Sequence, residues 1–339
     1  MNKYQIIVLF FCLHFFNIKV RAQVDPHFTQ FYAFPVWLNP AMSGVINGGD
    51  CRLVAVHRNQ WNKVTNPYAT FGISYDWLTK QTWGMGLQAV HQSAGNGGYQ
   101  NTTLAFSICN NNLAFGFEQE HHLSLALQIG INNRSIQPAK FQYGDQYNPV
   151  IGYDPSIASR ANNWINRQSI FQPDAAAGIF YYFSKGEESS VLPFGGISIS
   201  HINRPKDNFT DKESIIPIRY VAHTGAIVKT QSPLTLAPSL LYMKQGKSSE
   251  IIAGIQGEYP AMEKVSVSLG ANFRFGDAIN ILSSISYQNT RIGFSYDINT
   301  SGLKSFAKTV NSMEFSISRI IMRRDPYQDM IERCPAVKL

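Results

Sequence analysis

Acidic and basic side chains are scarce in this chain of 339 residues, at 15% of the total. Soluble domains of this size usually carry about 25% charged residues. Beyond the first 22 residues, no apolar run approaches the roughly 18 residues that a membrane-spanning helix needs, because glycine, serine and charged residues interrupt each one. The scarcity of charge argues against an ordinary soluble domain, and the interrupted runs argue against helical membrane spans.

The first 22 residues have the features of a secretory leader. Lys3 precedes an apolar run from Ile6 to Phe16, and Val20-Arg21-Ala22 provides a small-residue cleavage pattern just before Gln23. The sequence therefore predicts a cleaved signal peptide over residues 1–22 and export of a mature chain that begins at Gln23.

Charge and cysteine content limit the partners and cross-links of the mature chain. It would carry 26 basic and 22 acidic residues, because Lys3, Lys19 and Arg21 leave with the leader. Lys and Arg form no cluster interleaved with aromatic residues, so we expect no nucleic-acid partner. The exported compartment permits disulfides, but an odd number of cysteines remains and the sequence does not choose a pairing. These cysteines are Cys51, Cys109 and Cys334.

Aromatic residues are frequent, at 13%, and many segments alternate between apolar and polar side chains. Residues 123–131 place Leu and Ile at every second position, with Ser, Ala, Gln and Gly between them. Residues 265–275 repeat this pattern, with Val, Leu, Ala and Phe on one face. A period of two residues predicts a β-strand, and the second face is too polar for the core of a sandwich.

About fourteen such segments occur, each near the length of a strand that spans a membrane. Strands in lipid must close into a barrel, because an open edge would leave backbone N–H and C=O groups without partners. The alternative is a soluble secreted β-sandwich, which the few Lys and Glu residues on these segments disfavour. We therefore predict an all-β, transmembrane outer-membrane β-barrel of about fourteen antiparallel strands. The segments are 51–60, 69–77, 83–91, 99–108, 122–131, 175–183, 192–200, 220–229, 235–243, 250–258, 265–274, 278–287, 291–297 and 310–319.

The lengths of the connections predict which way the barrel faces. Bacterial barrels have short periplasmic turns and longer extracellular loops. If the first strand starts on the periplasmic side, the two longest connections, 132–174 and 201–219, both face outward. The connection 109–121 is an exception, because it would face inward although it is long.

No catalytic or cofactor-binding motif is present in the sequence. It contains no Gly-x-Ser-x-Gly elbow, no His-Glu-x-x-His helix, no phosphate-binding glycine loop and no Cys-x-x-Cys pair. We therefore predict no enzyme activity and no cofactor. The densest titratable group lies in a connection, and its two adjacent histidines would point to opposite faces of a strand, so we predict no metal site. This group is Glu118, Glu120, His121 and His122.

Several arginines lie in or beside the predicted strands, with two aspartates nearby. They either bind a ligand in the lumen or form ion pairs that rigidify the barrel interior. We favour ion pairs, because a polar lumen is normal for such barrels. The residues are Arg58, Arg219, Arg274, Arg291, Asp277 and Asp297.

Particular motifs resemble the PorP/SprF family of Bacteroidota outer-membrane proteins over nearly the whole mature chain. The opening motifs are the most specific: residues 25–32 (DPHFTQFY), 38–41 (LNPA) and 57–61 (HRNQW). Later matches are Gly44, Gly178–Tyr182, Pro238–Leu241, Arg274 with Asp277-Ala278, Gly293–Ile298 with Ser301-Gly302-Leu303, Glu314 and Cys334-Pro335. Members commonly end in an aromatic residue, whereas this chain ends in Ala336-Val337-Lys338-Leu339.

The resemblance implies a part in type IX secretion and gliding motility. It implies a non-enzymatic protein that anchors or helps deliver an adhesin-type secreted protein at the cell surface. Its partners would be the carboxyl-terminal region of this cargo, periplasmic type IX or peptidoglycan-associated components, and outer-membrane lipid. We expect a signal peptide (1–22), a periplasmic or lumen-plugging segment (23–50), the barrel (51–319) and a periplasmic tail (320–339).

Candidate partner-binding residues lie at the predicted outward end of the barrel. Aromatic side chains commonly dominate protein interfaces, and the longest connection contains several, although they could instead pack the loop onto the rim. A motif at the outward end of the first strand adds polar candidates. The set is Arg58, Asn59, Trp61, Tyr143, Tyr147, Tyr153 and Trp164. The alternative function is a diffusion porin or a transporter of small hydrophobic molecules, because strand number does not show whether the lumen is open.

Overall fold

The computed structural model describes residues 25–60, 68–79, 83–94, 98–160, 167–184, 189–209, 214–300 and 311–322. The predicted signal peptide and most of the predicted periplasmic tail lie outside these residues. No helix among the described residues has the length and apolar character to cross a membrane.

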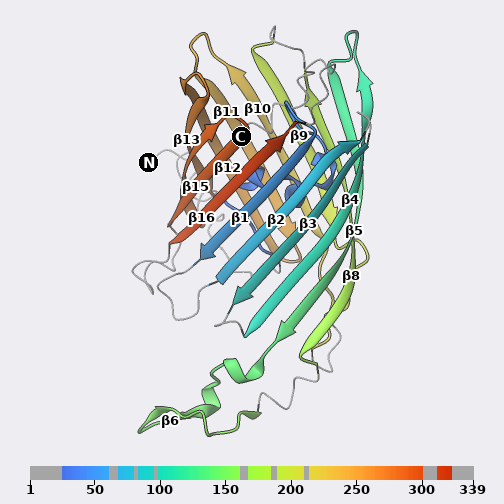
Figure 1. The fold of residues 1–339 in the computed structure, drawn as a ribbon. Helices are drawn as coiled ribbons and strands as arrows, with labels where there is room; N and C mark the ends of the chain where they lie inside the picture. The colour runs from blue at the N-terminus through green and yellow to red at the C-terminus, as the bar shows by residue number, and fades with distance from the viewer. Residues whose placement is uncertain are drawn as a thin grey trace, which may run out of the picture.

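Fourteen antiparallel strands form a closed barrel, in which the first strand pairs with the last (Figure 1). Apart from this closing pair, neighbouring strands of the barrel wall follow one another along the chain. The predicted class and strand number are confirmed. The strands are β1 (Cys51–Gln60), β2 (Tyr68–Thr79), β3 (Trp83–Ala94), β4 (Tyr99–Phe115), β5 (His121–Ile136), β8 (Ser169–Phe183), β9 (Val191–Ser200), β10 (Arg219–Lys229), β11 (Thr235–Gln245), β12 (Ser248–Met262), β13 (Val265–Arg274), β14 (Ala278–Tyr287), β15 (Thr290–Asn299) and β16 (Ser312–Ile321).

Side chains alternate between the two surfaces of the barrel wall. On the outer surface, Leu127, Ile129 and Leu269 are 70%, 67% and 66% exposed. On the inner surface, Ser124 and Ser268 are buried. An apolar exterior around a polar interior is the arrangement that a bilayer requires of a barrel, so the faces predicted from the alternation are confirmed.

The prediction of a long inward connection at 109–121 is wrong, because both flanking strands are longer than the alternating pattern indicated. β4 continues to Phe115 and β5 begins at His121, which leaves a turn of residues 116–120. The register shifts between Asn110 and Leu113. Such a bulge adds an unpaired residue and breaks the alternation, which is why the sequence pattern ended early.

The two ends of the barrel differ in the length of their connections. We call the end that carries 137–168 and 201–218 the loop end, and the opposite end the turn end. The turn end includes the tight connections 263–264 and 288–289. The connection 137–168 extends well beyond the barrel and has its own short elements (Figure 1). These are η3 (Pro138–Lys140), η4 (Gly144–Gln146), β6 (Tyr147–Asn148) and β7 (Gly152–Tyr153).

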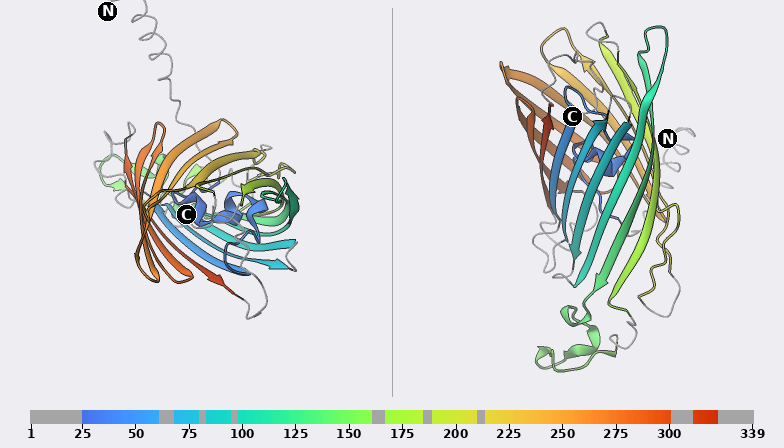
Figure 2. Two further views of the ribbon diagram at one scale, coloured as in Figure 1. Left: turned by 90° about the horizontal axis from the view of Figure 1, so that it is seen from above. Right: turned by 45° about the vertical axis from the view of Figure 1, so that its right-hand side comes forward.

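Residues 25–50, which we call the plug, lie inside the barrel. Seen from above, the short helices of this segment occupy the lumen (Figure 2). They are η1 (Phe31–Ala33), α2 (Pro35–Leu38) and η2 (Pro40–Met42). A barrel of eight strands is filled by its own side chains, but a wider one leaves space. In this barrel of fourteen strands the plug takes up that space.

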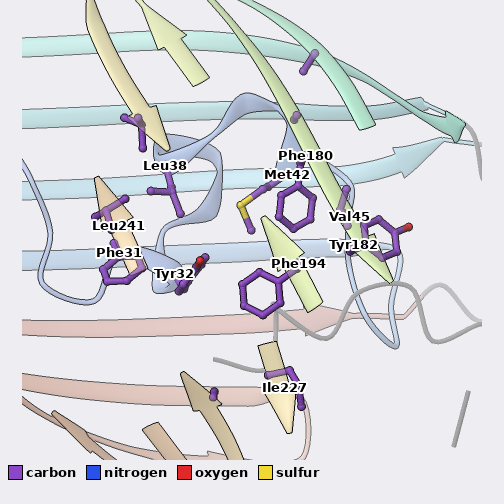
Figure 3. Packing of buried hydrophobic residues seen from close by; sticks show 14 of the residues in the cluster. Phe31, Tyr32, Leu38, Met42, Val45, Phe180, Tyr182, Phe194, Ile227 and Leu241 are labelled. Atoms are coloured by element: carbon purple, nitrogen blue, oxygen red, sulfur yellow. The ribbon is translucent and has the colours of Figure 1, made fainter. Parts of the chain in front are cut away.

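The plug packs through an apolar cluster against one side of the inner wall (Figure 3). Phe31, Leu38 and Met42 of the plug lie among wall residues that include Phe180 and Phe194. Each of these five side chains is at most 7% exposed. Burial of one such side chain is worth about 1.5–3 kcal/mol, so the plug contributes a hydrophobic core that the barrel wall alone would lack.

Candidate functional site

The candidate residues that the structure describes do not lie together in one site. Arg58 is fully buried in the lumen, although the sequence analysis placed it at the outward rim. Asn59 is half-buried at the end of β1. The positions of Trp61 and Trp164 lie outside the described residues. The three tyrosines all belong to the connection 137–168. The predicted set therefore combined a residue of the lumen, Arg58, with residues of this loop.

Arg58 belongs to a buried charge network at the loop end of the lumen. Its guanidinium donates to Asp297 Oδ2 at 2.7 Å and to Glu314 Oε2 at 3.1 Å. Arg274 also contacts the first of these carboxylates, with its Nη1 3.5 Å from Asp297 Oδ2. It also contacts Glu250 at 3.1 Å. The ion-pair interpretation of the lumen arginines matches these contacts.

The charge network holds the plug. The backbone N–H groups of Thr29 and Gln30 donate to the two carboxylate oxygens of Glu314, at 2.8 and 2.9 Å. The Thr29 hydroxyl lies 2.9 Å from Asp297 Oδ1 and also contacts Arg58. One plug residue therefore bridges both acids and their arginine, which explains why these charges are buried in the lumen.

A second polar group fastens the start of the plug to the connection 201–218. Asp25 Oδ2 lies 2.7 Å from His201 Nε2, and the opposite ring nitrogen lies 2.9 Å from Asp174 Oδ1. Arg219 approaches Asp25 at 3.4 Å. His201 has φ of 60°, a left-handed conformation that costs a non-glycine residue free energy. Such strain persists where neighbouring contacts impose it, and the two carboxylates supply those contacts.

The contacts of His201 make the stability of the plug sensitive to pH. Burial lowers the pKa of His201, but the Asp25 and Asp174 carboxylates outweigh this effect and raise the pKa to about 9. The pKa of His201 in the folded protein is above its ordinary value of about 6.5. The contribution of charged His201 to the free energy of unfolding is therefore complete below pH 6.5 and disappears as the pH rises through 9. We expect His201→Gln to lower the free energy of unfolding, relative to the wild type, by up to about 3 kcal/mol at pH 6.5 and by little at pH 10.

Thermal unfolding of the purified barrel at several pH values, followed by its heat-modifiable migration, measures this difference. His57→Gln is the matched control, because His57 is exposed on the outer wall. A difference between His201→Gln and the wild type that is the same at pH 6.5 and pH 10 would contradict a charged His201.

The turn end of the plug fits against glycines that the sequence analysis did not single out. A Cβ atom on Gly84 would lie 1.9 Å from the Ser43 carbonyl oxygen, and one on Gly86 would lie 2.7 Å from the Ser43 hydroxyl. Asp76 accepts the Gly44 N–H at 2.9 Å. The sequence contained a signal for this contact, because glycines on the polar face of a strand such as β3 often mark the close approach of another backbone.

The described part of the connection 137–168, up to residue 160, has an interior held by hydrogen bonds and an exposed apolar tip. The Asp145 carboxylate accepts bonds from the Ser159 hydroxyl at 2.8 Å and from the Arg160 N–H at 2.9 Å. At the tip, Val150 and Ile151 are 90% and 67% exposed. Tyr147 beside them is 56% exposed, whereas Tyr143 and Tyr153 are half-buried. Only one of the predicted tyrosines is therefore largely exposed, and two aliphatic residues join it.

The remaining sequence candidates have local structural contacts. His121 stacks on the exposed Phe115, whereas His122 stacks on the buried Tyr182, so the two rings lie on opposite faces of β5. Among the described residues, no three His, Cys, Asp or Glu side chains are arranged to hold a metal ion. Cys51 and Cys109 are buried and are not bonded to each other.

Comparison with known proteins links this architecture to a family. No curated protein matches the sequence. Solved structures that resemble it include the Ralstonia pickettii toluene transporter TbuX, with 8% identity, a TM-score of 0.49 and coverage of 84% of this chain and 93% of that one. The Pseudomonas putida toluene transporter TodX has 8% identity, a TM-score of 0.49 and coverage of 86% and 94%.

The family match covers almost all of the plug and barrel. The model described as "Type IX secretion system membrane protein PorP/SprF" matches residues 20–318. The resemblance that the sequence motifs indicated is thereby confirmed, and the chain belongs to the PorP/SprF family of type IX secretion system membrane proteins.

Proposed function

We propose that this barrel anchors, or helps to deliver, an adhesin-type secreted protein at the cell surface, and that its loop end binds the carboxyl-terminal region of this cargo. The loop end faces outward in this proposal. The proposal rests on membership of a type IX secretion family together with a barrel whose longest connection projects from one end.

The observation that carries the proposal is the apolar tip of the connection 137–168. Tyr147, Val150 and Ile151 are more than half exposed on a loop whose interior is hydrogen-bonded. Exposed apolar side chains gathered at one place commonly mark a protein-binding surface. A folded loop also binds at a lower entropic cost than a flexible one.

The filled lumen disfavours the alternative function, a diffusion porin or a transporter of small hydrophobic molecules. The plug contributes Phe31, Tyr32 and Met42 to a buried cluster inside the barrel. A porin needs a continuous aqueous path, and a transporter of apolar molecules needs an apolar cavity in place of this packed core. Anchoring requires neither path nor cavity.

Further parts of the proposal concern the other end of the barrel. The turn end would face the periplasm and contact periplasmic type IX or peptidoglycan-associated components. The leader 1–22 would be removed before insertion into the outer membrane. We also propose that the protein has no catalytic activity of its own and that its cargo serves gliding motility.

Replacing Tyr147, Val150 and Ile151 together by serine tests cargo binding. We expect at least a tenfold loss of co-purified cargo and its release into the medium, because interface anchors commonly contribute more than 1 kcal/mol each. The measurement is affinity purification from solubilised outer membranes, with surface-bound cargo counted on intact cells.

Gln142→Ser is the matched control, because Gln142 is exposed on the same connection but polar. An epitope inserted beside Asn148 should be labelled on intact cells, which checks that the loop end faces outward. If the triple variant assembles normally and retains its cargo, the tip is not the binding surface.

A further inference from the structure

An apolar furrow crosses the outer surface of the barrel wall from β1 to β5. Its volume is about 610 Å³. Two neighbouring rows of outward-facing side chains border it, and the members of each row are paired across the strands. The row nearer the loop end is Ile73, Ala89, Leu104 and Ile131. The row nearer the turn end is Leu53, Tyr75, Leu87, Phe106 and Ile129.

Ala89 opens the centre of the furrow. It has the smallest side chain of the two rows and lies between the larger Ile73 and Leu104 of the neighbouring strands. Gln88 and Gly130 also line the furrow, although these positions point into the lumen. Successive residues of a strand point to opposite faces, so only their backbone reaches the outer surface. The floor of the furrow is therefore the backbone of the barrel wall.

The furrow has the length and the direction of one acyl chain. It crosses neighbouring strands that are about 4.8 Å apart, so from β1 to β5 it is roughly 19 Å long. The hydrocarbon core of a bilayer is about 30 Å thick, so one leaflet is about 15 Å. The strands are tilted, and the furrow runs obliquely from Leu53 near the turn end of β1 to Ile131 nearer the loop end of β5 (Figure 1). A single extended apolar chain of one leaflet fits along it.

A polar row, His91, Thr102 and Asn133, borders the furrow on its loop-end side. These residues are cross-strand neighbours on β3, β4 and β5, two positions beyond the first apolar row. His91 is exposed, and its Nδ1 lies 2.8 Å from the Thr102 hydroxyl. The Asn133 side-chain oxygen accepts from the Ser169 hydroxyl at 2.9 Å, which leaves the amide nitrogen as a donor. Imidazole and amide donors are suited to phosphate oxygens.

We propose that the furrow and the polar row together bind one phosphate-bearing membrane lipid, with an acyl chain in the furrow and the phosphate at the polar row. The inference goes beyond cargo anchoring and does not depend on it. Lipid tails are as apolar as the furrow, so preference for this lipid comes from close packing over Ala89 and from the headgroup contacts. A peptide segment is the poorer occupant, because its backbone would need hydrogen-bond partners in hydrocarbon and the two rows are almost entirely apolar.

Native mass spectrometry of the purified, delipidated barrel tests the furrow. After incubation with micelles that contain phosphatidylglycerol, we expect the wild type to retain one lipid per barrel. Ala89→Leu should lower this retention at least tenfold, because the larger side chain fills the centre of the furrow. Ala271→Leu is the matched control, since Ala271 is also exposed on the outer wall but lies on β13, away from the furrow. Heat-modifiable migration checks that both variants fold.

Diacylglycerol, which has the same acyl chains but no phosphate, tests the polar row. We expect the wild type to retain it at least tenfold less than phosphatidylglycerol, and His91→Leu combined with Asn133→Leu to abolish this preference. His57→Leu is the matched control, because His57 is exposed on the outer wall but separated from the polar row by Phe71.

The proposal is overturned if the wild type retains no phosphatidylglycerol, or if folded Ala89→Leu retains as much of it as the wild type and Ala271→Leu do. Equal retention of diacylglycerol and phosphatidylglycerol by the wild type would also overturn it, because the polar row would then not recognise phosphate.

Discussion

Arg58→Met is expected to lower the free energy of unfolding by about 3–5 kcal/mol, the largest stability effect of any substitution considered for this protein. The substitution keeps most of the side-chain volume but removes the cation between Asp297 and Glu314. Both carboxylates are almost fully buried, at 4% and 0% exposed. Losing one partner of a buried ion pair leaves an uncompensated charge, and Arg274 lies too far from Glu314 for any ion pair between them.

Denaturant unfolding of the folded barrel in detergent measures this loss. Arg291→Met is the matched control, because its pair with Glu258 is partly exposed and should contribute no more than about 1 kcal/mol. Neutralising the acids by Asp297→Asn and Glu314→Gln in the Arg58→Met background should recover part of the loss. Equal effects of Arg58→Met and Arg291→Met would contradict the role given to the buried network.

Leu127→Arg is expected to cost about 2–4 kcal/mol of barrel stability in lipid. Leu127 lies midway along β5 and is 70% exposed on the outer wall. A charge at this depth must leave water for hydrocarbon, and the cost is greatest near the middle of the bilayer. Unfolding from lipid vesicles, rather than from detergent, is the measurement that resolves the effect.

Gln128→Arg is the matched control for Leu127→Arg, because the neighbouring side chain points to the opposite surface of the same strand. Gln128 is half-buried on the polar inner side, so we expect the barrel to tolerate a charge there better. If Gln128→Arg proves more destabilising than Leu127→Arg, the assignment of Leu127 to the lipid-facing surface and of Gln128 to the lumen is wrong.

The barrel wall was predictable from the sequence because its signals are local. In residues 265–275 the alternation alone assigns each side chain to lipid or lumen, since successive side chains of a strand point to opposite faces. Strand boundaries depend on more than this alternation. β4 was predicted to end at residue 108 but continues to Phe115, because a bulge interrupts the alternation that carries the signal.

The candidate site was only partly predictable. The sequence analysis found the lumen arginines and favoured ion pairs. It did not find that Thr29 and Gln30 share Glu314 with Arg58. Thr29 and Glu314 are 285 positions apart, and no periodicity within a strand carries information about such a pair. The prediction of binding residues in the loop was also incomplete. It selected aromatic residues, whereas Val150 and Ile151 stand out only by their exposure in the structure.

The sequence by itself determined the class of the fold, the number of strands, the face of each side chain and the family, because these depend on local alternation and contiguous motifs. Only the tertiary structure decided what fills the lumen. The segment 25–50 has no alternation of its own, and its conformation depends on contacts with strands that follow much later in the chain. Closure of the barrel brings Arg58 of β1 beside Glu314 of β16. The acceptor for the plug therefore exists only once the first and last strands have paired.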